Sequence, residues 1–509
     1  MSSSVSIPTP NATTSLQRWS LLFTVAAGLL LIALDNSILY TALPTLERDL
    51  NANAGQLLWI INAYPLVMAG LLLGAGTLGD RIGHRRMFLI GLLIFGLASI
   101  AAAFSPSPNA LIAARAFLAI GAAAMMPATL ALIRLVFTDA KERNLAIAIW
   151  GSVALVGAAT GPVLGGLLLE RFWWGSVFLI NVPVVVVALV ATYLLAPKHQ
   201  ETHKRPWDAV SSLLALVALS GLVFGIKSLS TADPSVSTAL ISWGVFAAAG
   251  YLFVRRQGKL THPLLDFALL RHPGLLAGTL AAAFTTFGLG GLQLVTTQRF
   301  QLVEGMTPLQ AGLLVSAMAL GAIPASLAGG ALVDRIGMRP LISGGLAVAA
   351  FGATIVGATL DYGVVWTGTG CVITGIGMGM TISVASLAIV GNVPSHRAGM
   401  ASAVEEVSYE LGALLAVALL GSLLSALYAA FIVLPEGVPA AAQSSLGEAL
   451  RISSSTTTND GSLVAAAISA YDRAYVIVVI SAAAALAVGS FVTSRLLRGP
   501  YSQAPKGGH

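Results

Sequence analysis

The chain has 509 residues, of which 56% are hydrophobic and only 9% are charged, and its formal net charge is +6. Soluble domains are about 25% charged, so the composition excludes an ordinary soluble protein. The single cysteine, Cys371, excludes an intrachain disulfide. The sequence contains neither the phosphate-binding pattern GxxxxGK[ST] nor a metal-ligand motif. We therefore expect an integral membrane protein that is not an enzyme, not an ATP-driven pump, and needs no metal or cofactor.

Apolar runs recur along nearly the whole chain, and each is long enough to cross a hydrocarbon layer of about 30 Å as a helix. The first run lacks a small-residue cleavage site, so we interpret it as a retained helix and not a signal peptide. The prediction is an all-α integral membrane protein with fourteen transmembrane helices. The predicted helices begin near Ser20, Leu57, Met87, Asn109, Asn144, Trp174, Asp208, Ser237, Leu275, Leu309, Pro340, Gly363, Gly399 and Arg473.

Basic residues are distributed unevenly between the two sides of this predicted topology. Of the 27 Lys and Arg residues, 20 fall on the side of the N-terminus, six, including Arg299, fall on the opposite side, and Arg115 lies inside a helix. Cytoplasmic loops carry the excess of Lys and Arg, so both termini are predicted to be cytoplasmic. The membrane topology then accounts for the net positive charge, so we do not expect nucleic acid as a partner. The longest loop, about 428–472, is predicted to be external, either as a cap on the outer vestibule or as a flexible linker.

An internal repeat divides the chain. GTLGDRIGHRR at 76–86 recurs as GALVDRIGMRP at 330–340, and each copy joins two predicted helices on the cytoplasmic side. Such duplication is typical of transporters built from parallel repeats. It predicts a cytoplasmic tail at 1–19, a six-helix bundle at 20–200, two inserted helices at 201–260, a second six-helix bundle at 261–498, and a cytoplasmic tail at 499–509.

Both copies of the repeat, and a glycine-rich stretch between them, have a physical interpretation. The glycines permit a tight turn, and the charges can pair across the cytoplasmic seam between the halves as a conformational latch. The alternative is a basic loop that only sets topology. The predicted latch residues are Gly76, Asp80, Arg81, Gly83, Arg85, Arg134 as a partner of Asp80, Asp334 and Arg335. The stretch GPVLGG includes Gly161, Pro162, Gly165 and Gly166. Its small residues are predicted to let this helix press closely on a neighbour and shape a seam that opens and closes. The alternative is ordinary packing of a glycine-rich membrane helix.

Five charged residues fall inside predicted spans, where a charge costs at least about 2.5 kcal/mol and usually faces a cavity or a partner. At 1.5 Å per residue, Asp35 and Arg115 both lie roughly 9 Å below the external surface, so they are predicted to pair. The pair is either sensitive to substrate and protons or purely structural. Glu410 lies about 16 Å from the start of its helix, near mid-membrane.

Glu406 and Glu410 are four residues apart and share a helix face. Two carboxylates at low dielectric cannot both stay ionised cheaply, so this face is predicted to bind protons or a cation. Glu405 is rotated by about 100° from Glu406. It is predicted either to belong to the same proton and cation site as Asp35, Arg115, Glu406 and Glu410, or only to reach water near the cytoplasm. Candidate aromatic residues for cation–π contacts in the cavity are Tyr40, Tyr64, Phe284, Phe287 and Tyr409.

Several stretches resemble motifs of the major facilitator superfamily. GTLGDRIGHRR is similar to its loop signature, RAFLAIGAAAMMP from Arg115 to its helix 4 motif, and GPVLGG to its antiporter motif. LDNSILYTALP at 34–44 and WGSVFLINVP at 174–183 resemble the fourteen-helix drug:proton antiporters, and EEVSYELG resembles their exporters of quaternary ammonium compounds and methyl viologen. The resemblance implies two six-helix bundles plus two inserted helices, driven by the proton gradient.

The function expected from this resemblance is proton-coupled export of lipophilic mono- and divalent cations, such as quaternary ammonium antiseptics, dyes and methyl viologen. The implied setting is the bacterial inner membrane, with lipid, protons and small cations as partners and a monomeric chain. The alternative is a major facilitator permease for another small organic solute. A permease for sugars or anions would favour amide-rich or basic cavity helices, and no basic residue is predicted in the cores of the last six helices.

Overall fold

The computed structural model describes residues 14–197, 208–228, 235–261, 263–265, 267, 271–391, 398–436, 438–455 and 461–498. Within these residues, 14 helices are long and apolar enough to cross a membrane, which confirms the predicted number. Most of the predicted tail 1–19 and all of the predicted tail 499–509 lie outside the described residues. Residues 15–19 belong to the first helix.

The first half of the chain forms six of these spans. The first and second spans begin at capping boxes, in which Thr14 and Asn53 accept a hydrogen bond from the backbone three residues later. The sixth span consists of two consecutive segments, α6 and α7. The helices are α1 (Ser15–Leu50), α2 (Ala54–Ile82), α3 (His84–Ala103), α4 (Pro108–Val136), α5 (Ala140–Arg171), α6 (Ser176–Leu179) and α7 (Asn181–Leu195).

Two added helices, α8 (Ala209–Ser228) and α9 (Val236–Gln257), stand between the halves in sequence. An ion pair of 2.9 Å between Asp208 and Arg256 joins them at one end. α8 also packs on α2: Lys227 Nζ donates to the Gly55 carbonyl at 2.6 Å. A small apolar cluster of Leu66, Val223 and Leu414 brings together α2, α8 and α14 of the second half. The added pair therefore lines the side of the molecule where α2 meets α14.

The second half contains the remaining six spans. One of them begins as α14, passes through a π-helical turn at Ala416–Gly421 and continues as α15. The last span begins at Ser462 and not at the predicted Arg473, because the largely apolar segment before Arg473 is helical too. The helices are α10 (Pro273–Leu302), α11 (Pro308–Ile336), α12 (Met338–Ala358), α13 (Val364–Val390), α14 (Ala398–Leu415), α15 (Ser422–Phe431), α16 (Leu446–Ser455) and α17 (Ser462–Leu496).

The segment between α15 and α17 contains the short helix α16 and contacts both halves. Tyr428 donates a hydrogen bond of 3.0 Å to the Ala442 carbonyl, and Ser445 donates one of 2.6 Å to Glu47 of α1. A small cavity of about 50 Å³ lies between these groups and the ends of α2 and α10. This part of the predicted loop 428–472 is therefore folded against the bundle.

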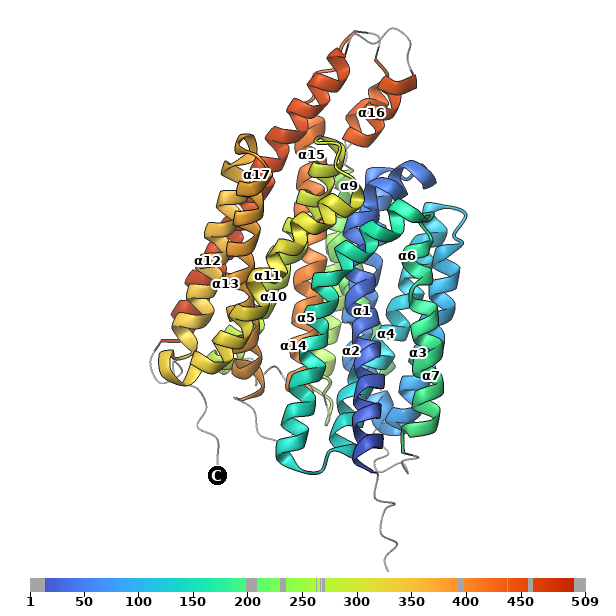
Figure 1. Ribbon diagram of the computed structural model, residues 1–509, viewed down its shortest axis with the longest axis vertical. Coiled ribbons are helices and arrows are strands. Elements are labelled where there is room, and N and C mark those ends of the chain that lie inside the picture. Colours follow the sequence, from blue (N-terminus) through green and yellow to red (C-terminus); the bar gives the residue numbers. More distant parts are fainter. Residues whose placement is uncertain are drawn as a thin grey trace, which may run out of the picture.

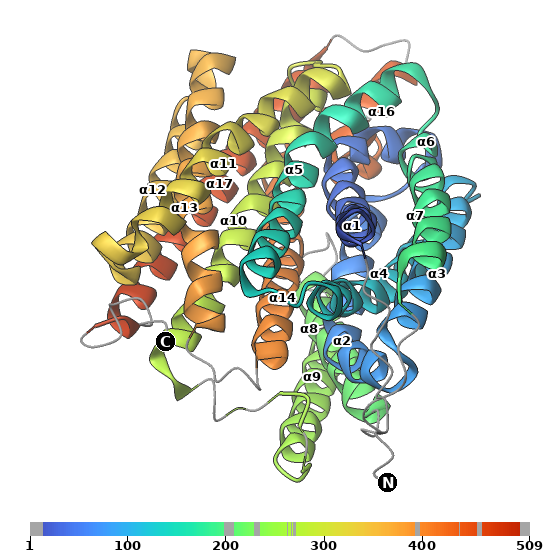
Figure 2. The same ribbon diagram turned by 60° about the horizontal axis from the view of Figure 1, so that its bottom comes forward.

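Two faces of the molecule can be named from the arrangement of the helices. The start of α1 and the end of α17 lie on one face, which we call the terminal face, and α16 lies on the opposite one, the α16 face (Figure 1). Figure 2 turns the terminal face toward the viewer and shows α8 and α9 beside α2. An even number of spans requires both ends of the chain to lie on the same side of the membrane.

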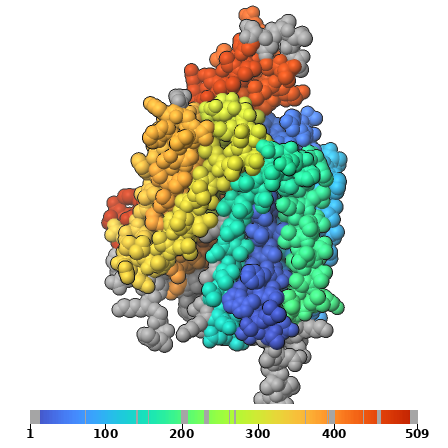
Figure 3. Space-filling model, in the orientation of Figure 1, coloured from blue at the N-terminus to red at the C-terminus, as the bar shows by residue number. Residues whose placement is uncertain are grey.

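Contacts between the halves lie toward the α16 face. Gly312 of α11 packs against the Pro162 carbonyl of α5, and Ser316 donates a hydrogen bond of 2.9 Å to the Ala159 carbonyl. Gln301 of α10 donates one of 3.0 Å to the Thr41 carbonyl of α1. In the space-filling view, α11 (yellow) meets α5 (teal) in the part nearer α16 (Figure 3). The halves are thus closed together at the α16 face.

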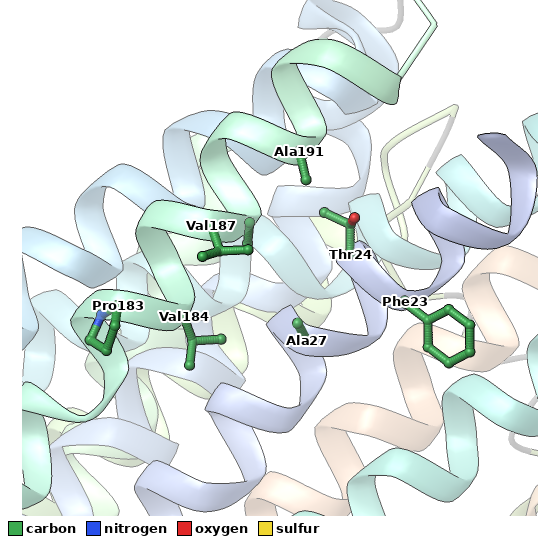
Figure 4. A pocket seen from close by; sticks show the side chains of 8 residues that line it. Phe23, Thr24, Ala27, Pro183, Val184, Val187 and Ala191 are labelled. Carbon is green, nitrogen blue, oxygen red and sulfur yellow. The ribbon is translucent and has the colours of Figure 1, made fainter. Parts of the chain in front are cut away.

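A groove of about 420 Å³ runs along the outside of the first half, between α1 and α7 (Figure 4). Its lining is apolar except for Thr24, whose hydroxyl already donates to the Ser20 carbonyl at 2.8 Å. Phe23 at its edge is 64% exposed. A surface of this kind suits the hydrocarbon of a bilayer and offers no group that would select a charged solute.

Candidate functional site

The predicted pair in the first half is confirmed. Asp35 of α1 and Arg115 of α4 form an ion pair in which both side chains are completely buried. Helix geometry brings them together, since α1 and α4 run in opposite directions and both residues lie at the same depth. A buried charge without a partner is costly, so the pair stabilises two groups that neither helix could bury alone.

Arg115 is held by more than its aspartate. Its Nε donates to the Ile60 carbonyl at 3.2 Å, and its Nη2 donates to Asn36 Oδ1 at 3.3 Å. The ring of Tyr64 lies beneath the guanidinium, 4.7 Å from centroid to Cζ. The guanidinium is planar and its donors are fixed relative to one another, so these contacts leave it a single orientation.

The three acids of α14 have different surroundings. Glu405 is only 9% exposed and accepts a hydrogen bond of 3.0 Å from Tyr409 of the same helix. The expectation that Glu405 reaches water near the cytoplasm is therefore wrong: the rotation of about 100° away from Glu406 turns it into the protein. Glu406 and Glu410 are half-buried, on the shared face that the sequence predicts.

Glu410 connects the two halves of the site. It lies close enough to Arg115, Tyr40 and Tyr64 of the first half to interact with them electrostatically. Glu406 interacts in the same way with Glu410. The structure thus brings together two groups of residues that the sequence places in separate halves. One half supplies a buried ion pair and two tyrosines, and the other supplies two carboxylates.

The candidate aromatic residues divide into two sets. Tyr40 and Tyr64 lie at the site, and the Tyr64 hydroxyl has no hydrogen-bond partner within the described part of the chain. Tyr409 is bound to Glu405. Phe284 packs against Gly489 of α17 and Phe287 packs against the main hydrophobic core, so both rings contribute to packing within the protein.

The predicted latch residues lie on the terminal face, and within the described part of the chain they are not joined across the halves. Asp80 is paired with His84 at 3.3 Å, between α2 and α3, and not with Arg134, which is exposed. Arg85 donates to the Tyr193 carbonyl at 2.7 Å. Gly83 has a φ of 91°, which only glycine adopts readily. Asp334, Arg335 and Arg81 are exposed, and Gly76 lies near Pro127 of α4.

The glycines of GPVLGG lie where α5 touches two other helices. A Cβ at Gly161 would collide with the Ser37 hydroxyl of α1, and one at Gly165 would lie 2.8 Å from Ile38 Cγ2. A Cβ at Gly166 would lie 2.6 Å from the Leu309 nitrogen of α11, across the seam between the halves. Pro162 lies inside α5, and its carbonyl faces Gly312 of α11. The motif therefore shapes both a contact within the first half and the contact between halves.

Two polar residues with clear structural roles were missed by the sequence reasoning. Asn181 is fully buried and donates to Asp35 Oδ1 at 3.2 Å. Arg299, placed outside the helix cores by the sequence, is 3% exposed within α10 and pairs with Asp472 of α17 at 2.8 Å. Arg299 lies in the last turn of α10, which ends at Leu302, so it is a buried basic residue at the end of a helix and not in its core. The sequence did offer one signal for Asn181, which is a polar amide within a predicted membrane span.

Comparison with known proteins agrees with this architecture. The family model of the Major Facilitator Superfamily matches residues 25–417 and 275–498. The methyl viologen resistance protein SmvA of Salmonella typhimurium is 37% identical over 455 residues, covering 88% of this chain and 92% of that protein. The multidrug efflux pump LfrA of Mycolicibacterium smegmatis is 38% identical over 432 residues, covering 84% and 86%.

Solved structures share the fold. A bacterial homologue of the human lysosomal transporter Spinster, in an inward-facing and unoccupied conformation, superposes with a TM-score of 0.65 and 17% identity, covering 96% of this chain and 100% of that one. A D-xylose–proton symporter gives a TM-score of 0.57 over 80% of this chain and 90% of that one, at 13% identity. The chain is therefore an integral, multi-pass transport protein that belongs to the major facilitator superfamily.

Proposed function

We propose that the protein is a proton-coupled exporter of lipophilic organic cations, with quaternary ammonium compounds, cationic dyes and methyl viologen as substrates. One observation supports this most directly. Glu406 and Glu410 lie half-buried on one face of α14, and Glu410 interacts electrostatically with Tyr40, Tyr64 and Arg115 of the first half. The methyl viologen and multidrug resistance relatives agree with a cationic substrate.

The chemistry of such a site favours exchange of a cation for protons. Two nearby carboxylates in a low-dielectric cavity repel each other unless one takes up a proton or a cation lies between them. Tyrosine faces attract organic cations through their quadrupole. A bound cation and a bound proton therefore exclude each other, which is the requirement for antiport. The proton gradient supplies the energy, and no cofactor enters the proposed cycle.

We assign the terminal face to the cytoplasm, in agreement with the distribution of basic residues. The closed contacts at the α16 face then correspond to the state in which the site is shielded from the exterior and loads substrate from inside. Protons enter when the halves part at the α16 face. Transport by a single chain in a bacterial inner membrane is the simplest form of this proposal.

The number of protons needed for export differs between monovalent and divalent cations. Moving one charge through 100 mV corresponds to about 2.3 kcal/mol, and one pH unit to about 1.4 kcal/mol. Exchange of one monovalent cation for one proton is electroneutral, so the pH gradient alone drives it. Exchange of one dication for two protons is electroneutral as well, and the two exchanging carboxylates can carry that number of protons. More than two protons would be needed before the membrane potential assists the export of a dication.

The test is uptake of tetraphenylphosphonium or methyl viologen into inverted membrane vesicles that carry the protein. We expect accumulation when the vesicle interior is acidic, and loss of accumulation when the pH gradient is collapsed at constant potential. Vesicles with an empty expression vector are the control. Accumulation that is indifferent to the pH gradient would rule out proton antiport, and accumulation of neutral solutes alone would favour the permease alternative.

A further inference from the structure

The amide of Asn181 holds one side of the Asp35 carboxylate. Asn181 is fully buried at the first residue of α7, and its Nδ2 lies 3.2 Å from Asp35 Oδ1 and 3.3 Å from Ser99 Oγ. Arg115 binds the other oxygen, Asp35 Oδ2. Each carboxylate oxygen therefore has its own donor, from α7 and from α4. The carboxylate cannot rotate without losing one of them.

Close glycine contacts fix Asn181 in this position. A Cβ at Gly175, just before α6, would meet the Ala103 carbonyl at the end of α3. A Cβ at Gly96 of α3 would lie 2.8 Å from Val185 Cγ1 of α7. The sixth span therefore lies directly against α3, which carries Ser99. These contacts give a physical role to the stretch WGSVFLINVP, whose residues otherwise have no place in the site.

The groups that face Asp35 show what this amide contributes. The charged or titratable groups are Arg115 from α4 and Tyr64 from α2. Glu410 of α14 interacts in turn with both of them. From α3 and α7 come only the neutral Ser99 and Asn181. Asn181 is thus the neutral donor to a carboxylate whose partner, Arg115, interacts electrostatically with Glu410 of the other half.

We propose that Asn181 is a positioning residue for proton coupling, which acts through Asp35 to hold Arg115 opposite Glu410 and so sets the pH range of export. This inference rests on the proposed proton antiport. Asn181 has no assigned contact with substrate. Its effect passes through one hydrogen bond, which fixes the Asp35 carboxylate and with it the guanidinium of Arg115.

The variant Asn181→Leu has a similar volume and lacks the donor. Hydrogen bonds to charged groups are strong enough that losing one corresponds to about a tenfold change in proton affinity. We expect the pH of half-maximal tetraphenylphosphonium export to move upward by about one unit, because an Arg115 that is held less firmly opposes the protonation of Glu410 less. Asn181→Ser, whose shorter side chain does not reach Asp35, should give the same shift if the leucine variant is not inserted.

A matched control lies on the same helix. Thr192 is buried in α7 without a hydroxyl hydrogen bond among the described groups, so Thr192→Val changes a polar group of α7 without touching Asp35. We expect its pH profile to match that of the parent protein.

The second readout is the pH dependence of tetraphenylphosphonium binding to purified protein. In an Asp35→Asn background, Asn181→Leu should leave that dependence unchanged, because the two residues act in series.

Each outcome has a separate meaning. A pH profile of Asn181→Leu and Asn181→Ser that equals that of Thr192→Val overturns the positioning role. A further change on top of Asp35→Asn also overturns it, because Asn181 would then act independently of Asp35. If the unmodified protein exports no cation in a pH gradient, the proposed antiport itself is wrong. If the unmodified protein exports normally and only the expected shift is missing, the antiport stands and the role of Asn181 does not.

Discussion

At the scale of single residues, the site combines a fully buried charge pair with two half-buried acids. Arg115 is bound by a carbonyl, an amide oxygen and a carboxylate, and lies over a tyrosine ring. Glu406 and Glu410 are half-buried and belong to the other half of the chain. The contrast in surroundings separates a group that organises the site from groups that, in the proposed antiport, change their charge state.

Neutralising the exchanging acids should affect substrates according to their charge. Glu406→Gln and Glu410→Gln keep side-chain volume and remove the charge. We expect both to impair export, and methyl viologen to suffer more than tetraphenylphosphonium, because a dication loses about twice the attraction in a low-dielectric cavity. Export of both substrates at equal membrane abundance measures this. Small and equal losses for both substrates would leave these acids with a structural role only.

Glu405 should respond differently from its neighbours, because it is turned into the protein and bound by Tyr409. Glutamine still accepts that hydrogen bond, so Glu405→Gln should retain most export and most thermal stability. Glu405→Ala leaves the tyrosine hydroxyl without its partner, and the lost bond should cost roughly 1–3 kcal/mol. Thermal unfolding of both purified variants tests this. A severe export defect in a stable Glu405→Gln protein would place Glu405 among the exchanging acids.

At the scale of elements, the glycines of α5 distinguish a contact within a half from one between halves. Gly166 meets the start of α11, while Gly151 of the same helix has open space around the position of its missing Cβ. We expect Gly166→Leu to force α5 and α11 apart at the α16 face, which opens a leak or stops turnover. Gly151→Leu is the matched control and should export normally. Recordings of vesicle pH without substrate measure the leak, and tight coupling in Gly166→Leu would contradict this role.

The elements also show how far sequence reasoning reaches. The fourteen spans and the Asp35–Arg115 pair could be predicted, because apolar length and helical depth are local properties of the sequence. The π-helical turn at Ala416–Gly421 could not, since its residues are ordinary helix formers and the turn depends on packing against α2 and α10. Asn181 was missed for a related reason: its partner Asp35 is 146 residues away in the chain.

At the scale of the whole molecule, the two halves form one site only because they are closed together at the α16 face. Leu58 of α2 meets Gly421 of the π-helical turn, and Thr41 of α1 accepts a hydrogen bond from Gln301 of α10. Among the residues that the structure describes, the latch residues on the terminal face are meanwhile unpaired across the seam or paired within their own half. The latch therefore remains a prediction for the opposite state, in which these contacts would exchange.

Locking the closed face should stop transport without harming the fold. The end of the Leu58 side chain meets Gly421 across the two halves. In a Cys371→Ser background, which removes the native thiol, Leu58→Cys and Gly421→Cys together introduce two thiols that can form a disulfide between the halves. We expect oxidation to abolish export, because alternating access requires these helices to part, and reduction to restore it.

The control is a second pair within one half. A Cβ at Gly357 of α12 would lie 3.5 Å from Val479 Cβ of α17, which suits a disulfide. Oxidising Gly357→Cys and Val479→Cys should leave export intact, since both helices belong to the second half and move together. Substrate binding to the oxidised Leu58–Gly421 pair should persist, because the assembled site is the one present in the closed state. The contrary outcome is undiminished export by vesicles in which the Leu58–Gly421 cross-link has been verified. It would show that the halves do not separate at this face, and it would contradict a mechanism in which one half rocks against the other.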